Sequence, residues 1–136
     1  MAMKNPYQKY QDNSVNTATA GELTLMLYNG CIKFIKLAKK GIEDKNIEVK
    51  NTNIQKAQKI VQELMVTLNP EVAISQQLMP LYDYMNRRLM EANVQNDSSI
   101  LDEVEGLATE FRDTWKQVIQ LNKKPTAAGA DSSVSG

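Results

Sequence analysis

Histidine is absent from the 136-residue sequence, and this limits the chemistry that the chain can do. Histidine is the commonest general base in catalysis and the commonest protein ligand for metal ions. The serines therefore have no histidine to activate them, and the glycines are scattered singly, without the spacing of a phosphate-binding loop. No catalytic constellation results, and we expect the protein not to be an enzyme.

Acidic residues could build a di-metal site inside a helical bundle, but such sites use glutamate with histidine three residues later. The sequence cannot supply that pair, so we expect no metal and no cofactor. The candidate glutamates also fall mainly on the outer strips of the expected helices: Glu63, Glu91, Glu103, Glu105 and Glu110.

Two further features could carry chemistry. Cys31 is the only cysteine, and its apolar surroundings favour a small buried side chain over a reactive thiol. The basic pair Arg87-Arg88 has two interpretations. It is either an exposed face with local ion pairs to Asp83 or Glu91, or an anchor for a partner.

Composition narrows the class of protein. Sixteen basic residues balance sixteen acidic ones, which argues against a chain built to bind nucleic acid or an anionic membrane. No apolar run approaches the roughly 18 residues of a membrane span, and the N-terminus lacks the apolar stretch of a signal peptide. We expect one cytoplasmic domain.

The stretch from Thr19 to Ile42 organises the chain. Thr19 and Glu22 have the spacing of a capping box, which predicts a helix that begins at Ala20. Apolar residues cover more of this helix than the single stripe of about 100° that is typical of a surface helix. The pattern therefore places this helix at the centre of a bundle. Its two apolar stripes contain Leu23, Leu27, Phe34 and Leu37, and Leu25, Tyr28, Ile32 and Ile35.

Three further helices are predicted at about 46–68, 70–93 and 98–121. Their short connections favour antiparallel neighbours. Pro80 lies inside the third expected helix and predicts a kink or break near residues 76–80.

Local signals set the expected ends of these helices. Asn69-Pro70 offers a cap and a first-turn proline for the third helix. Ser99 with Asp102 resembles a second capping box at the start of the fourth, and Pro125 follows its expected end.

The prediction is an all-α, antiparallel four-helix bundle over residues 19–122. An extended N-terminal arm (1–18) precedes it, and a disordered tail (123–136) follows. The arm is either frayed or docks Tyr7 and Tyr10 onto the bundle or a partner.

The first three helices carry more apolar residues than one seam needs. Methionine both fills irregular cores and lines adaptable binding surfaces, so two interpretations stay open: core packing, or a groove for an amphipathic segment of another chain. Five of the seven methionines lie in these helices: Met26, Met65, Met79, Met85 and Met90.

Longer blocks of sequence resemble the FliS family of flagellar secretion chaperones. The first block runs from Asn5 to Cys31 and includes Asn-Pro-Tyr-x-x-Tyr and Gly-Glu-Leu-Thr-Leu-Met-Leu-Tyr-Asn-Gly-Cys. The second runs from Leu81 to Asn93, and the third is Phe-Arg-Asp-x-Trp at 111–115. The resemblance covers about residues 5–120. Ala20, where the family usually has proline, and Pro80 depart from the family pattern.

The resemblance implies a four-helix-bundle chaperone that binds the disordered C-terminal segment of flagellin in the cytoplasm. Such a chaperone blocks premature polymerisation and assists delivery to the flagellar export gate. The arm would cover the hydrophobic groove when flagellin is absent, with Tyr7 and Tyr10 contributing to the gate contact. The groove positions that match are Ile54, Ala57, Ile60, Val61, Leu64, Tyr82 and Met85. The alternative is a scaffolding or regulatory bundle that forms a homodimer through the same apolar surface.

Overall fold

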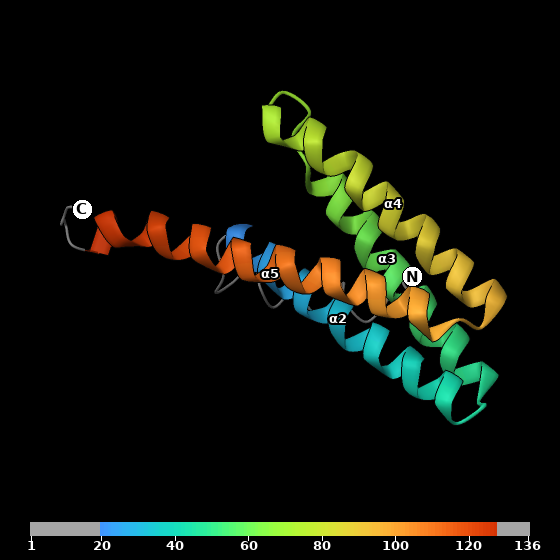
Figure 1. Cartoon of the computed structure of the whole chain (residues 1–136). Coiled ribbons are helices and arrows are strands. Elements are labelled where there is room, and N and C mark those ends of the chain that lie inside the picture. Colours follow the sequence, from blue (N-terminus) through green and yellow to red (C-terminus); the bar gives the residue numbers. More distant parts are fainter. Residues whose placement is uncertain (1–19, 128–136) are drawn as a thin grey trace, which may run out of the picture. The chain divides into compact units, whose positions relative to one another are not determined.

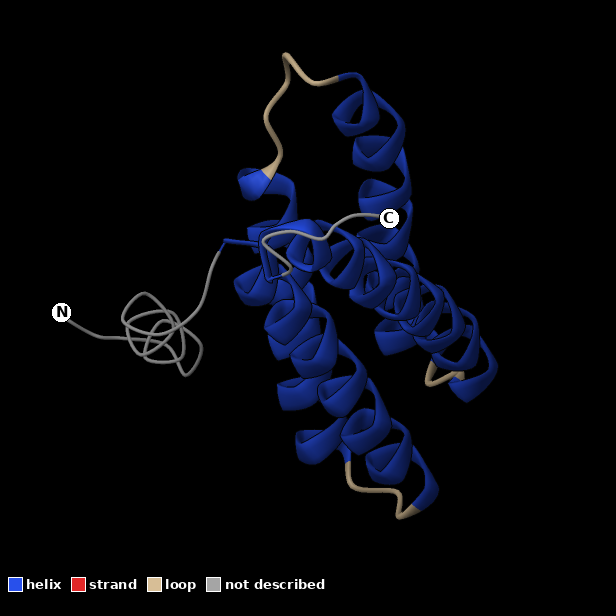
Figure 2. Ribbon diagram, turned by 90° about the vertical axis from the view of Figure 1, so that its left-hand side faces the viewer, coloured by secondary structure: helices blue, strands red, loops and turns tan. Residues whose placement is uncertain are grey.

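The computed structural model of the chain describes residues 20–127, and the side chains of residues 21–121. Four helices occupy this described range: α2 (Ala20–Glu43), α3 (Ile47–Thr67), α4 (Ala73–Gln95) and α5 (Ser98–Ala127). Figure 2 shows these helices joined by short loops. The predicted all-α class is confirmed. The expected arm, with Tyr7 and Tyr10, and the last residues of the expected tail lie outside the described residues.

The first connection follows from local hydrogen bonding. α2 begins at Ala20, as predicted, and ends in a turn where Lys45 has a φ of 57°. The amide of Asn46 donates to the carbonyl of Gly41 at 2.8 Å, which closes that turn. The side chain of Asn46 then accepts from the amide of Val49 at 3.1 Å and caps α3.

The start of α4 differs from the prediction. The helix begins at Ala73, not at Pro70. The side-chain oxygen of Asn69 accepts from the amide of Glu71 at 3.0 Å, and its carbonyl accepts from the amide of Val72 at 3.0 Å. These two bonds hold residues 69–72 in a turn, which delays the helix by three residues.

The predicted break at Pro80 is wrong, because α4 runs through this residue without interruption. A proline leaves the carbonyl four residues earlier, that of Gln76, without its helical donor. Both Gln76 and Pro80 are exposed, so water can satisfy that carbonyl. Buried side chains after the proline, including Tyr82 and Met85, anchor the rest of the helix.

α5 begins at Ser98, as predicted, but its capping residue and its C-terminal end differ from expectation. The carboxylate of Asp97 accepts from the amide of Ser99 at 2.9 Å and from its hydroxyl at 2.6 Å, so Asp97 rather than Ser99 caps the helix. The helix continues to Ala127, past the expected end near Leu121. Proline has a φ that helices share, so Pro125 weakens the last turns without ending the helix there.

The chain divides into two compact units. One is Leu27–Thr109, and the other combines residues 1–26 with residues 110–136. Within Leu27–Thr109 the bundle core is formed by side chains from all four helices. Figure 1 shows α3 and α4 side by side and running in opposite directions.

Ion pairs join α5 to α2 within Leu27–Thr109. Lys39 contacts Asp102 at 2.6 Å and Glu105 at 2.8 Å, and Lys36 contacts Glu105 at 2.8 Å. Because one lysine serves two carboxylates and one carboxylate serves two lysines, these charges form a network, which is more favourable than isolated surface pairs.

A hydrogen bond also joins α5 to α2 within the unit that combines residues 1–26 with residues 110–136. The indole nitrogen of Trp115, on α5, donates to the carbonyl of Gly21, in the first turn of α2, at 2.7 Å. A half-buried indole usually finds such an acceptor, and this bond fixes the ring over the start of α2.

Candidate functional site

The side chains predicted to line a partner groove lie in the core of the bundle. Each is at most 2% exposed: Ile54, Ala57, Ile60, Val61, Leu64, Tyr82 and Met85. They pack between α3, α4 and the other helices, so in this structure they form no open surface. That they meet a partner in another state stays a prediction.

Tyr82 illustrates how these residues are held in the core. Its hydroxyl and that of Tyr28 on α2 lie 2.5 Å apart, with the two rings tilted at 53°. Burial and this hydrogen bond raise the pKa of Tyr82, so the phenol stays neutral. The pair is a neutral, hydrogen-bonded link between α2 and α4 inside the core.

Apolar side chains are nevertheless exposed on Leu27–Thr109. All but Leu37 lie on α3, on α4 or in the turn between them: Ile47, Val49, Val66, Val72, Ile74, Met79, Leu81, Met90 and Val94. Single exposed apolar residues are ordinary, but a concentration on two neighbouring helices marks a candidate contact surface.

One side of the α3–α4 pair carries two of these positions, Met79 and Met90. The amide of Gln58 on α3 donates to that of Asn86 on α4 at 3.5 Å, which marks where the two helices meet on this side. Residues seven or eleven apart share a helix face. Met65 therefore lies on the Gln58 face, and Met79 and Met90 lie on the Asn86 face. We call these five residues (Gln58, Met65, Met79, Asn86 and Met90) the outer α3–α4 seam.

The opposite sides of both helices are already occupied. On α4, Tyr84 donates to Glu103 of α5 at 2.5 Å, and Arg88 contacts the same carboxylate at 2.9 Å. On α3, the ammonium of Lys56 lies 5.3 Å from the ring centre of Phe34 on α2. Since α2 and α5 cover these flanks, the outer seam is the flank that no other helix of Leu27–Thr109 covers.

The two basic residues of α4 are engaged locally. Arg87 contacts Asp83 at 3.0 Å, and Arg88 contacts Glu91 at 2.7 Å as well as Glu103. The prediction of local ion pairs is confirmed. The hydrogen bonds from Tyr84 and Arg88 lower the pKa of Glu103.

Cys31 is fully buried, and burial raises the pKa of its thiol to about 12. The predicted buried thiol is confirmed. Within the described residues, no group of three acidic or cysteine side chains could hold a metal ion. No helix in that part of the chain is both long and apolar enough to cross a bilayer.

The sequence matches a known protein family. The model of the family described as "Flagellar protein FliS" matches residues 3–122. The chain belongs to the FliS family. It is therefore a flagellar secretion chaperone by family, and a protein exported for the flagellum is the kind of partner that this implies.

Individual relatives agree with the family match. The chain is 59% identical to the flagellar secretion chaperone FliS of Bacillus subtilis over 124 residues, which cover 91% of this chain and 93% of that protein. It is 35% identical to FliS of Escherichia coli over 109 residues, covering 78% and 80%. A crystal structure of a bacterial flagellar chaperone has the same fold, with a TM-score of 0.70, 19% identity, and coverage of 85% and 95%.

The sequence offered Met65, Met79 and Met90 as candidates for an adaptable surface, but the groove positions implied by the family resemblance were other residues, and these lie in the core. The strongest apolar face of a helix is its core face, and those positions belong to it. A second stripe was readable in α4, since Met79, Asn86 and Met90 recur at seven and four residues. The methionines were the available signal for an adaptable surface.

Proposed function

We propose that this chain is an export chaperone that binds the disordered C-terminal segment of flagellin on the outer α3–α4 seam. The observation that carries the proposal is the set of exposed apolar side chains on α3 and α4, together with membership of the FliS family. Binding there hides the segment's apolar face, which would otherwise drive filament assembly. Delivery to the export gate, with contact through Tyr7 and Tyr10, is the further part implied by the resemblance.

The seam suits an amphipathic helix as its ligand. Met79 and Met90 offer flexible thioether side chains that adapt to a varied apolar face, and Gln58 and Asn86 offer hydrogen bonds between them. A segment that folds on binding typically buries about 1,000–3,000 Å² and loses about 2–5 kcal/mol to ordering. Binding therefore needs a larger contact area than the seam alone offers. The neighbouring exposed residues of α3 and α4 supply additional contact area.

No nucleotide or catalytic step is needed for this activity. The chaperone and the growing filament compete for the same apolar face of flagellin, and the chaperone prevails while its complex is the more stable. Release then requires only that the export apparatus bind the segment or the chaperone more tightly. Such a mechanism places the protein in the cytoplasm, where flagellin is made.

The experiment is a calorimetric titration of the full chain with a peptide of the flagellin C-terminal segment. Met79→Lys should weaken binding at least about 10-fold, because a lysine ammonium would lose water in the contact. Leu37→Lys is the matched control, since Leu37 is 40% exposed on α2 and Met79 is 39% exposed. Leu37→Lys should leave the affinity unchanged.

The result that overturns the proposal is equal binding by both variants, or no binding by the unaltered chain at high micromolar peptide. Light scattering on the same samples tests the homodimer. Self-association that is lost in Met79→Lys, without any peptide binding, would favour the scaffolding alternative.

A further inference from the structure

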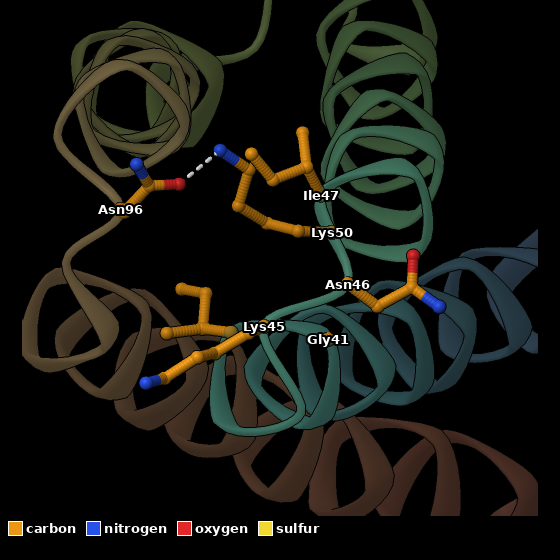
Figure 3. A pocket seen from close by; sticks show the side chains of 7 residues that line it. Gly41, Lys45, Asn46, Ile47, Lys50 and Asn96 are labelled. Carbon is orange, nitrogen blue, oxygen red and sulfur yellow. Dashed lines mark hydrogen bonds between the residues drawn. The ribbon is translucent and has the colours of Figure 1, made fainter.

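A cavity at the corner between α2 and α3 contains a buried lysine that has no acidic partner among the described residues. The cavity has a volume of about 260 Å³ and is lined by the α2–α3 turn, the first turn of α3 and Asn96, which follows α4. Lys50 is only 4% exposed. Figure 3 shows its ammonium beside the side chain of Asn96, to which it donates a hydrogen bond.

The ammonium of Lys50 is only partly compensated. It offers three donors, and two are used, by the carbonyl of Asn93 at 2.9 Å and by the side-chain oxygen of Asn96. Both acceptors are neutral. They belong to the C-terminal end of α4, which is equivalent to about half a negative charge. A buried cation is costly unless a full opposite charge meets it, so the site retains a need for an anion.

The nearby carboxylates of the described chain are engaged elsewhere. Glu43 and Asp44 lie 3.9 Å and 3.5 Å from the ammonium of Lys40. Asp97 accepts two hydrogen bonds from Ser99. None of the three forms an ion pair with Lys50, so among the described residues this ammonium has no carboxylate partner and can accept one from a ligand.

The remaining lining gives the ligand its character. Lys45 lines the cavity from the turn, with a left-handed backbone (φ 57°), and Figure 3 shows its ammonium turned away from that of Lys50. Ile42 and Ile47 form apolar walls, and Ile47 is 61% exposed, so that wall is open to solvent. Asn96 contributes a side-chain amide.

We propose that this cavity binds an α-carboxylate that carries an apolar side chain and an adjoining amide. A polypeptide C-terminus and a free acylated amino acid share this chemistry. The carboxylate would lie at Lys50, the apolar side chain against the two isoleucines, and the amide at Asn96. The site stands apart from the outer α3–α4 seam and does not depend on flagellin binding.

The test uses N-acetyl-leucine and N-acetyl-leucinamide, which differ only in the charge of the carboxyl group. Amide chemical shifts of the ¹⁵N-labelled full chain are followed during each titration. N-acetyl-leucine should shift the amides of Lys45, Asn46 and Asn96, and the amide should bind at least about 10-fold more weakly, as expected for loss of a charge-assisted hydrogen bond. Equal binding of the two compounds, or no shift up to tens of millimolar, would overturn the proposal.

Variants separate binding from folding. Lys50→Met keeps the aliphatic stem and removes the charge, and it should abolish the shifts. Ile47→Ala should also weaken binding because it removes an apolar wall, and Ile47 is 61% exposed, so this variant tests the site even if Lys50→Met unfolds. Lys59→Met, an exposed lysine elsewhere on α3, is the matched control and should bind normally. Normal binding by Ile47→Ala and by a folded Lys50→Met would refute the site.

An octapeptide ending in leucine with a free carboxylate identifies the source of the ligand. Tighter binding than N-acetyl-leucine supports a polypeptide C-terminus, and weaker binding supports a free acylated amino acid. Both results retain the carboxylate chemistry.

Discussion

Gly41 provides the sharpest test of how the α2–α3 corner is packed. A methyl group built on its Cα would lie 2.7 Å from the backbone nitrogen of Lys50, 3.0 Å from its Cα and 3.1 Å from Cγ1 of Val49. Two of these neighbours are backbone atoms at the start of α3, which cannot rotate away as a side chain can. Gly41→Ala must therefore move the two helices apart.

The magnitude follows from two opposing effects. Overpacking of this kind typically costs about 1–3 kcal/mol, and the backbone contacts place this case near the upper end. Replacing glycine by alanine in a helix gains up to about 1 kcal/mol. The net expectation is a loss of about 1–2 kcal/mol. For a chain of this length, that corresponds to a melting temperature lower by roughly 4–8 °C.

Gly106 is the matched control, because it is also helical and an added methyl group would meet no atom within 4 Å. Gly106→Ala should gain about 1 kcal/mol and raise the melting temperature by a few degrees. Thermal and urea unfolding followed by circular dichroism measure both variants. If Gly41→Ala proves as stable as the unaltered chain, the reasoning about this corner is refuted.

Three further predictions concern the core and its charges. Cys31 should react with a thiol reagent at pH 8 at least about 100-fold more slowly than free cysteine until denaturant is added, and rapid labelling of the folded chain would contradict its burial. Leu64→Ala should lower the free energy of unfolding by about 2–5 kcal/mol in urea titrations, as expected of a core residue, and a loss below 1 kcal/mol would instead favour a groove position. The bonds from Tyr84 and Arg88 depress the pKa of Glu103 below its ordinary value of 4.5, so their stabilisation is present above that pH and is lost as pH falls through the depressed value. The melting temperature should therefore fall less between pH 6 and pH 3 in Glu103→Gln than in the unaltered chain, and equal slopes would contradict the assignment.

Helix positions were predictable because their signals are local. α2 begins at Ala20, as expected from its capping box, and α3 begins within one residue of the expected start near Asn46. The errors also have local causes. Side-chain bonds from Asn69 and Asp97 competed with Pro70 and Ser99 for the helix starts, and sequence spacing alone does not decide such competition.

Whether α4 breaks at Pro80 could not be predicted from the sequence of that helix alone. Pro80 removes one backbone hydrogen bond of the helix, but whether the helix breaks depends on packing elsewhere. The core contacts of Tyr82 and Met85 hold α4 together after the proline, and the lost bond falls on an exposed face. Both the core contacts and the exposure of that face are set by the tertiary structure, which the local sequence does not reveal.

The candidate surface was the least predictable part. Apolar residues on a helix can face the core or a partner. Apolar periodicity alone does not tell which of these applies to Leu64 or to Met79. The structure separates them, because Leu64 is fully buried and Met79 is 39% exposed. The buried Lys50 was also unpredictable, since its acceptors come from α4, more than forty residues away in sequence.

The hydrogen bond between Trp115 and Gly21 has a practical consequence. Because Trp115 is the only tryptophan, the selectively excited tryptophan fluorescence of the chain reports on one compact unit and is nearly silent about Leu27–Thr109. Circular dichroism, by contrast, averages over every helix. A shift of the emission maximum that precedes the loss of ellipticity on heating would mean that the chain melts in two stages, with the first turn of α2 separating from α5 before the larger unit gives way.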